Sequence, residues 1–319
     1  MPKVTIALIT YNRPNYLRDA IKGAISQTFK DFELLIMDNG SDVPTRQIID
    51  SFDDSRIVYH RNPENSSEFI NEAFLYAKGE YLLITHDDDI MMSDMIRRQL
   101  DVLENDRDVL AVACNMSDIN SQGKILKKIT HKLNKDLIFE KEQFIDFYLT
   151  RGISLTCPTV MMRLEKFKEH NLKFDASVGP ATDVYFWFKI NLLPFRIYFI
   201  CQPLYLYRIH ENQDSTLNKL SMEISLYKGL EAFLMKNKLD QYINQLKKLK
   251  MNTIFSVLTN FYINNKINRD QFNAYLSSLE EIGLQPEVSK KSMIRLNIFR
   301  ISPALYKIIF SFYATVKTW

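Results

Sequence analysis

Several features that mark particular classes of protein are scarce or missing in this sequence of 319 residues. Only eight glycines are present, and none forms the glycine-rich loop that cradles phosphates in many nucleotide-binding proteins. The formal net charge of +3 is too small to indicate a nucleic-acid partner. No segment approaches the roughly 20 apolar residues of a membrane span, and the first residues do not have the pattern of a signal peptide.

Cysteine is also scarce. Cys114, Cys157 and Cys201 are far apart in the chain, and no C-x-x-C spacing suggests a metal site. Reduced thiols in a cytoplasmic protein are the expectation that follows. The chain is 46% hydrophobic and 25% charged, which is typical of a soluble globular protein. Its length suits one large domain or two of moderate size.

The first hundred residues alternate short apolar runs with helical patterns. Strands are predicted at 4–10, 32–38, 56–60, 81–85 and 109–115. Helices are predicted at 14–27, 44–52 and 66–77, with a further helix from Ser93, a good N-cap. This alternation predicts an α/β fold with a mostly parallel, Rossmann-like central sheet.

The rest of the chain changes in character. Strands are predicted at 159–163 and 196–210, and a short helix at 183–191. Beyond about residue 217 the patterns are helical, so we predict a domain at 1–216 and an α-helical region at 217–319.

Three consecutive aspartates, Asp87 to Asp89, follow the predicted strand at 81–85, and Asp38 ends the strand at 32–38. Ligands of parallel sheets bind beyond the carboxyl ends of the strands. Carboxylates there suit Mg²⁺ or Mn²⁺ together with a phosphate group. The alternative is a solvated acidic loop at the start of the next helix, whose first turn favours negative charge.

Tyr11 follows the first predicted strand, in the segment TYNRP. Its ring could stack on a nucleobase, and Asp38 could accept hydrogen bonds from a base or ribose. The alternatives are an ordinary loop aromatic and an ordinary turn former.

Three ordered segments resemble family 2 glycosyltransferases, which have the GT-A fold. They are VTIALITYNRPNYLRDAIKGAISQTFKDFELLIMDNGSD, KGEYLLITHDDDIMMSDMI and PATDVYFWFKINLLPFRIYFICQPLYLYRIHENQDST. The resemblance covers about residues 1–216 and implies a nucleotide-binding half at about 1–115 and an acceptor half at about 116–216.

The resemblance also implies roles for individual residues. Asp183 matches the general base. The donor-nucleotide set is Thr10, Tyr11, Arg13, Asp38, Asn39, Asp87 and Arg208, and the metal set is Asp88, Asp89 and His210. Asp88 is the strongest expected ligand, because His86 stands where the family often has the first aspartate of Asp-Ser-Asp-Asp.

Three further departures from the family pattern concern the donor and the base. Asn39 stands where a second aspartate is frequent, and Ile70 where an arginine often helps to hold the nucleotide. Thr182 replaces the glutamate that commonly precedes the presumed base. The first two leave the donor open, whereas the third keeps Asp183.

The resemblance implies an inverting transferase that uses Mn²⁺ or Mg²⁺ to move a sugar from a nucleotide-diphosphate donor, with UDP favoured. The expected acceptor is a hydroxyl of a glycan, lipid-linked or protein-glycan molecule in bacterial-type surface polysaccharide or glycoprotein synthesis. A catalytically silent scaffold that assembles through its helical tail is the alternative. Phosphotransferases of the haloacid dehalogenase kind are disfavoured because their aspartates follow the first strand. Sugar nucleotidyltransferases are disfavoured because TYNRP is not a glycine-rich phosphate loop.

The C-terminal residues 286–319 carry six Lys or Arg and one Glu among many apolar side chains. We expect this segment to pack on its own domain or to form a homo-oligomer contact. The second expectation is peripheral contact with the inner face of the cell membrane.

Overall fold

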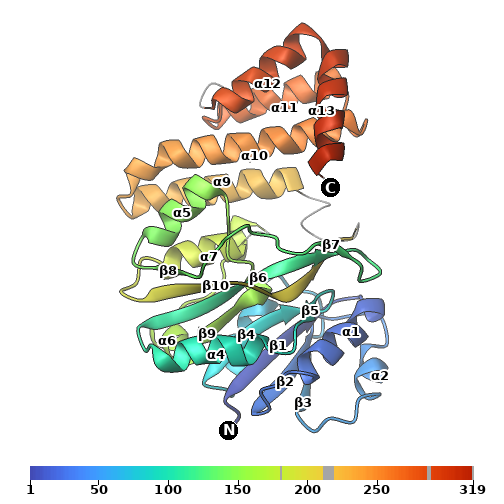
Figure 1. Ribbon diagram of the computed structural model, residues 1–319, viewed down its shortest axis with the longest axis vertical. Helices are drawn as coiled ribbons and strands as arrows, with labels where there is room; N and C mark the ends of the chain where they lie inside the picture. Colours follow the sequence, from blue (N-terminus) through green and yellow to red (C-terminus); the bar gives the residue numbers. More distant parts are fainter. Residues whose placement is uncertain (180–181, 211–218, 286–288, 318–319) are drawn as a thin grey trace. The chain divides into compact units, whose positions relative to one another are not determined.

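The computed structural model describes residues 1–179, 182–210, 219–285 and 289–317, with side chains as far as Ser311 (Figure 1). The chain forms two compact units. The first comprises Met1–Tyr148, Ile153–Ser177 and Thr182–Gln213, and the second comprises Leu149–Gly152, Val178–Ala181 and Asp214–Trp319. The boundary predicted near residue 216 lies outside the described residues.

The first unit is built on a ten-stranded sheet in the order β3-β2-β1-β4-β9-β6-β10-β5, with β7 beside β6 and β8 beside β10. Its strands are β1 (Val4–Thr10), β2 (Phe32–Asp38), β3 (Ile57–Arg61), β4 (Tyr81–His86), β5 (Ile90–Met91), β6 (Val109–Ile119), β7 (Ile125–Lys127), β8 (Leu137–Phe139), β9 (Val160–Arg163) and β10 (Arg196–Arg208). The pairs β3-β2, β2-β1, β1-β4 and β6-β10 are parallel. β9 lies antiparallel between β4 and β6 and thereby joins the two parallel sets.

Helices and short turns connect these strands. They are α1 (Pro14–Ile25), α2 (Thr45–Ile49), η1 (Phe69–Glu72), α3 (Ala73–Tyr76), α4 (Met95–Asn105), α5 (Gln143–Arg151), η2 (Cys157–Thr159), α6 (Leu164–Glu169), η3 (Ala176–Val178) and α7 (Thr182–Ile190). α1 begins at Pro14, which suits a first turn because proline has no N–H to satisfy there. α1 buries Leu17, Ile21 and Ala24, which recur at helical spacing, in the core against the sheet.

The structure corrects three of the predicted elements. The helix predicted at 66–77 is a 3₁₀ turn, η1, followed by the single turn α3. The N-cap of α4 is Asp94 rather than Ser93, whose carbonyl instead accepts a hydrogen bond from the N–H of Thr28 at 2.8 Å. The helix predicted at 44–52 is confined to Thr45–Ile49. In the first two cases contacts with distant residues outweigh local helix propensity.

The carboxyl ends of three neighbouring strands are level. Thr10 of β1 pairs with Asp38 of β2, and Ile9 of β1 pairs with His86 of β4. The loop of Asp87 to Asp89 therefore begins beside the loop that follows β1. This edge is where a parallel sheet presents ligand-binding side chains.

The second unit is helical, as predicted. Its helices are α9 (Lys219–Lys236), η4 (Asp240–Tyr242), α10 (Ile243–Ile263), α11 (Arg269–Glu281), α12 (Lys290–Ile301) and α13 (Pro303–Lys317). Aromatic rings form part of its core: the ring centroids of Phe272 and Phe299 lie 4.3 Å apart, and Tyr306 is fully buried. The C-terminal segment thus packs in part on its own unit. No helix among the described residues has the length and apolar character needed to cross a membrane.

Candidate functional site

Asp87 binds the loop after β1 through both carboxylate oxygens. Its Oδ2 accepts hydrogen bonds from Thr10 Oγ1 at 2.7 Å and from the N–H of Tyr11 at 3.1 Å. Its Oδ1 accepts a hydrogen bond from Arg13 Nη1 at 3.2 Å. These contacts bring together four of the residues predicted for donor binding and fix the loop TYNRP against the end of β4.

The carboxylate of Asp88 contacts the side chains of Arg13 and His210. Its Oδ2 is 3.1 Å from Arg13 Nη1 and 3.1 Å from His210 Nε2. The His210 ring also packs on Tyr16 of α1, with ring centroids 5.0 Å apart. The predicted metal residues Asp88 and His210 are therefore in direct contact, although 122 positions separate them in the chain.

Asp89 joins the acidic loop to the end of β10. Its Oδ1 accepts a hydrogen bond from the backbone N–H of Arg208 at 2.7 Å, and its Oδ2 accepts one from the Tyr205 hydroxyl at 3.1 Å. The Arg208 guanidinium is buried, and its Nε donates to the carbonyl of Asp88 at 2.7 Å. The side chain of Arg208 thus supports the backbone of the acidic loop.

The three carboxylates are almost completely buried. Burial raises the pKa of Asp87 to about 6, and the Asp88 charge adds to this shift while the charge of Arg13 opposes it. Burial, followed by the neighbouring charge of Asp88, raises the pKa of Asp89 well above its usual value. The ionised carboxylates of the three aspartates repel one another. A bound cation would offset this repulsion, because a nearby positive charge favours the ionised form of a carboxylate.

His86, Asp88 and Asp89 form a group that could hold a metal ion. One possible ligand atom from each lies within 4.8 Å of the others. One imidazole nitrogen and two carboxylate oxygens are a donor set that fits a divalent cation. His86 is a departure from the family pattern and was not predicted as a metal ligand; its position in the motif was the available signal.

Asp38 and Asn39 continue the site along the neighbouring strand. The carboxylate of Asp38 is 1% exposed and accepts hydrogen bonds from the N–H of Ser41 at 2.9 Å and from the Tyr59 hydroxyl at 2.8 Å. The carboxamide of Asn39 binds the 65–66 segment, where its Oδ1 accepts a hydrogen bond from the N–H of Ser66 at 3.0 Å. Both side chains therefore shape the loop after β2.

Asp183 comes from a different element, the first turn of α7. Its Oδ1 accepts a hydrogen bond from the N–H of Val184 at 2.8 Å. Burial raises the pKa of the nearby Cys157 thiol, and the charge of Asp183 raises it further. The carboxylate thus lies close to a buried thiol, in the same unit as the acidic loop.

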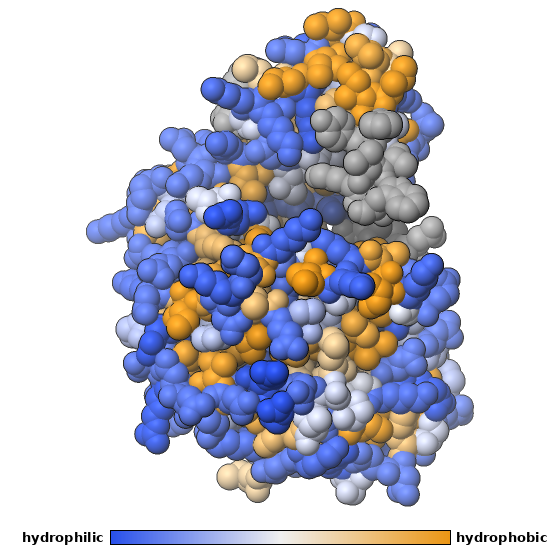
Figure 2. Space-filling view, viewed as in Figure 1, coloured by the Kyte–Doolittle hydropathy of each residue, from blue (hydrophilic) through white to orange (hydrophobic). Residues whose placement is uncertain are grey.

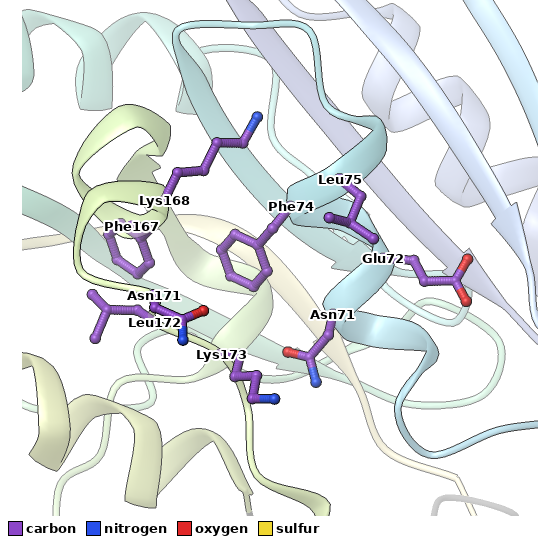
Figure 3. Close-up of a pocket in the computed structure, with 9 residues that line it drawn as sticks. All are labelled: Asn71, Glu72, Phe74, Leu75, Phe167, Lys168, Asn171, Leu172 and Lys173. Carbon is purple, nitrogen blue, oxygen red and sulfur yellow. The ribbon is translucent and has the colours of Figure 1, made fainter.

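A cavity of about 530 Å³ lies elsewhere in the first unit (Figure 3). Its lining comes from η1, α3, α6 and the segment after α6: Asn71, Glu72, Phe74, Leu75, Phe167, Lys168, Asn171, Leu172 and Lys173. None of the predicted site residues is in this lining.

Two tyrosines of the site were not predicted. The Tyr205 hydroxyl binds both Asp89 and Thr85, the latter at 2.8 Å, and it is fully buried. Tyr16 lies under the Arg208 guanidinium, which is 4.7 Å from the ring centroid. Tyr205 belongs to an apolar strand pattern and Tyr16 to an ordinary helix, so no signal in the sequence distinguished either.

Comparisons with known proteins show the family of the chain. The family model described as glycosyl transferase family 2 matches residues 5–170. A relative named uncharacterized glycosyltransferase MJ1057, from Methanocaldococcus jannaschii, is 28% identical over 228 residues, which cover 70% of this chain and 76% of the relative.

Solved structures extend the likeness in fold. The structure of S. aureus TarS 1–349 in complex with UDP-GlcNAc has a TM-score of 0.65 and 15% identity, covering 90% of this chain and 82% of that one. The mannosyltransferase PcManGT from Pyrobaculum calidifontis, in complex with GDP-Man and Mn²⁺, has a TM-score of 0.54 and 16% identity, covering 96% of this chain and 85% of that one.

Proposed function

Because the chain belongs to glycosyl transferase family 2, we propose that this glycosyltransferase moves a sugar from a UDP-sugar to an acceptor hydroxyl with inversion at the sugar carbon. The predicted GT-A fold is confirmed by its structural relatives. The observation that carries the proposal is the contact of Asp87 with Thr10 and Arg13, because it joins the first loop to the acidic loop at one edge of the sheet.

The donor diphosphate would lie against the acidic loop. His86, Asp88 and Asp89 would hold a divalent cation there, with His210 in contact with Asp88. When bound, such a cation neutralises charge on a leaving diphosphate. Arg13 would contribute a guanidinium that pairs with phosphate oxygens. PcManGT was solved with Mn²⁺, which supports Mn²⁺ as the first cation to test and Mg²⁺ as the second.

The nucleoside would occupy the loops after β1 and β2. Tyr11 is 39% exposed, so its ring is available for stacking. The buried carboxylate of Asp38 and the carboxamide of Asn39 line the neighbouring loop. UDP is the proposed nucleotide, and the UDP-GlcNAc complex of TarS supports it; the GDP-Man complex of PcManGT makes GDP the first competitor.

Asp183 would act as the general base. It would accept the proton of the acceptor hydroxyl as that oxygen forms its bond to the sugar carbon, while the bond from this carbon to the diphosphate oxygen breaks. The diphosphate leaves with the electron pair of that bond. Attack from the face opposite the leaving group gives inversion. A glycan, lipid-linked or protein-glycan hydroxyl of a surface polysaccharide or glycoprotein is the proposed acceptor.

The C-terminal helices α12 and α13 present exposed apolar and basic side chains. Ile294, Ile301, Leu305 and Ile308 are exposed, and Lys290, Lys291 and Arg300 lie on the exposed side of α12. Figure 2 shows apolar side chains gathered over these helices. We propose a contact between copies of the chain here, with an anionic membrane surface as the second candidate. Analytical ultracentrifugation tests the first, and co-sedimentation with anionic and neutral liposomes tests the second.

A donor panel tests the proposed activity. UDP-, GDP- and dTDP-sugars are incubated with the enzyme in the presence of Mn²⁺, Mg²⁺ or a chelator, and the release of nucleoside diphosphate is measured. The proposal expects release from one class of donor, strongest for UDP-sugars and lost with the chelator. A scaffold without catalysis predicts no release from any donor, and this result would overturn the proposal.

A further inference from the structure

Two side chains bridge consecutive backbone positions in the segment between α6 and α7. The N–H of Phe174 donates to Asn71 Oδ1 at 2.8 Å, and Asn71 Nδ2 donates to the carbonyl of Phe174 at 3.0 Å. The N–H of Asp175 donates to Thr182 Oγ1 at 2.9 Å, and this hydroxyl donates to the carbonyl of Asp175 at 2.9 Å. Both polar groups of each residue are therefore satisfied by a single side chain.

These bridges replace secondary structure. Residues 172–175 lie in neither helix nor strand, so a sheet ladder does not satisfy their backbone groups. Buried backbone groups need partners, and an unpaired one destabilises the fold. Phe174 is 1% exposed, so its backbone cannot rely on bulk water. Asn71 and Thr182 thus determine the path of this segment.

The second bridge ends at the residue next to Asp183. Thr182 is the first residue of α7, and Asp183 is the second. Two further contacts join the segment to the same helix: the ring centroids of Phe174 and Phe186 lie 4.1 Å apart, and Lys189 Nζ lies 3.9 Å from Asp175 Oδ2. The first turn of α7 is therefore fixed to residues 174–175.

The first bridge begins in η1, which starts three residues after Ser66, the residue whose N–H binds Asn39 of the loop after β2. Asn71 belongs to η1, and in Figure 3 its carboxamide lies on the cavity wall near Lys173. The two bridges therefore connect η1 to the turn that carries Asp183 over a sequence separation of more than a hundred residues.

We propose that Asn71 and Thr182 are positioning residues that orient the Asp183 carboxylate toward the acceptor hydroxyl. This inference rests on the proposed function, because it takes Asp183 as the base. It also explains how a threonine can stand in place of the family's glutamate: the hydroxyl of Thr182 holds the turn through Asp175.

The decisive comparison is Thr182→Val against Thr182→Ser. Valine keeps the shape and loses both hydrogen bonds, whereas serine keeps the hydroxyl. Misplacement of a reacting group by about 1 Å can cost about 10²-fold in rate, so Thr182→Val is expected to lower kcat by about 10-fold to 10²-fold. The Kd for UDP, measured by calorimetry, is expected to change by less than about twofold, since the two hydrogen bonds that valine removes go to Asp175. Thr182→Ser is expected to restore most of kcat.

Asn71→Ser tests the same inference independently, through the hydrogen bonds to Phe174. It replaces Thr182→Val as the test variant if Thr182→Val does not fold. Serine cannot span both backbone groups of Phe174. The expected result is again a lower kcat with little change in the Kd for UDP. A kcat equal to that of the wild type in the folded variants, or a loss confined to donor affinity, would overturn the inference.

The double variant separates the inference from the proposed function. If Thr182 acts through Asp183, then Thr182→Val adds no further loss of turnover in an Asp183→Asn background. If the fold-losses of turnover in the two single variants multiply in the double variant, the positioning role is overturned and the assignment of Asp183 as the base stands. If Asp183→Asn alone has the turnover of the wild type, Asp183 is not the general base, and the proposed function is refuted independently of the result for Thr182→Val.

Discussion

Thr10 Oγ1 donates a hydrogen bond to Asp87 Oδ2 at 2.7 Å, across a separation of 77 positions in the chain. Thr10 ends β1, and Asp87 directly follows the neighbouring parallel strand β4, so the sheet brings their loops together. The bond explains why an aspartate can be buried here: it is a hydrogen-bond acceptor for the first loop as well as a charge. Arg13 contacts both Asp87 and Asp88. Each of the three adjacent carboxylates also has a partner of its own: Thr10 for Asp87, His210 for Asp88 and Tyr205 for Asp89.

Asp87→Asn is expected to weaken donor binding. The amide can still accept a hydrogen bond from Thr10, but the ion pair with Arg13 is lost. The loop after β1 is then held less firmly in the form that receives the donor. If the whole contribution of such a charged hydrogen bond, about 1.5–3 kcal/mol, is lost from donor binding, the Kd for UDP rises by about 10-fold to 10²-fold. Calorimetry measures this change. Asp101→Asn, on the exposed side of α4, is the control and is expected to bind UDP like the wild type.

Metal binding is expected to depend on Asp88 and His86. Asp88→Asn and His86→Ala each remove a ligand from the group whose ligand atoms lie within 4.8 Å. Loss of even a supporting residue of a metal site costs about 10–100-fold in affinity, so at least this loss is expected for Mn²⁺. Titration calorimetry without donor measures it, with Asp101→Asn on the exposed side of α4 as control. Unchanged Mn²⁺ affinity in both variants would show that His86 and Asp88 are not ligands of the metal site.

Gly40 is expected to resist substitution more than Gly123. Both have a left-handed backbone, with φ of +79° and +81°. A Cβ at Gly40 would lie 2.6 Å from the carbonyl carbon of Glu64, whereas at Gly123 it would meet nothing closer than 3.9 Å. Both alanine variants pay about 1–2 kcal/mol for the conformation, but only Gly40→Ala must also move backbone. Thermal unfolding should therefore give a larger loss for Gly40→Ala; equal losses would refute the steric argument.

The helical unit contains a buried ion pair whose disruption should be costly. Lys250 Nζ lies 2.9 Å from Glu223 Oε2, with side chains 3% and 13% exposed. Removal of one partner of a buried pair costs about 3–5 kcal/mol, because the other charge stays buried. Glu223→Ala is expected to lower the denaturant midpoint strongly, whereas Glu281→Ala, at an exposed position of α11, should leave it nearly unchanged.

Stability should depend on pH through Asp54. The hydrogen bond from the Arg56 guanidinium lowers the pKa of Asp54 below its ordinary value of 3.8. A lowered pKa in the folded state stabilises the protein above 3.8, and this contribution is lost as the pH falls through the folded value. The melting temperature of Asp54→Asn should therefore lie below that of the wild type at neutral pH and converge with it in acid. A difference independent of pH would contradict this account.

The sequence predicted best what local patterns determine. The strand at 32–38 has the predicted bounds, and the acidic loop lies at a strand end as expected. It predicted less well where distant contacts decide. The helix predicted at 66–77 is one example, because it is a short 3₁₀ turn followed by a single α-turn. Within this segment, Ser66 is bound by the distant carboxamide of Asn39, and the carboxamide of Asn71 binds the distant backbone of Phe174. The antiparallel place of β9 between β4 and β6 likewise has no local signal.

The central claim is that Asp183 removes the acceptor proton beside a donor held at the acidic loop. Its most direct test is a comparison of wild type and Asp183→Asn with the donor identified in the panel, measuring donor Kd and transfer rate. The account predicts an unchanged Kd and a transfer rate lowered by about 10²–10⁴-fold. Transfer by Asp183→Asn at the rate of the wild type would contradict it.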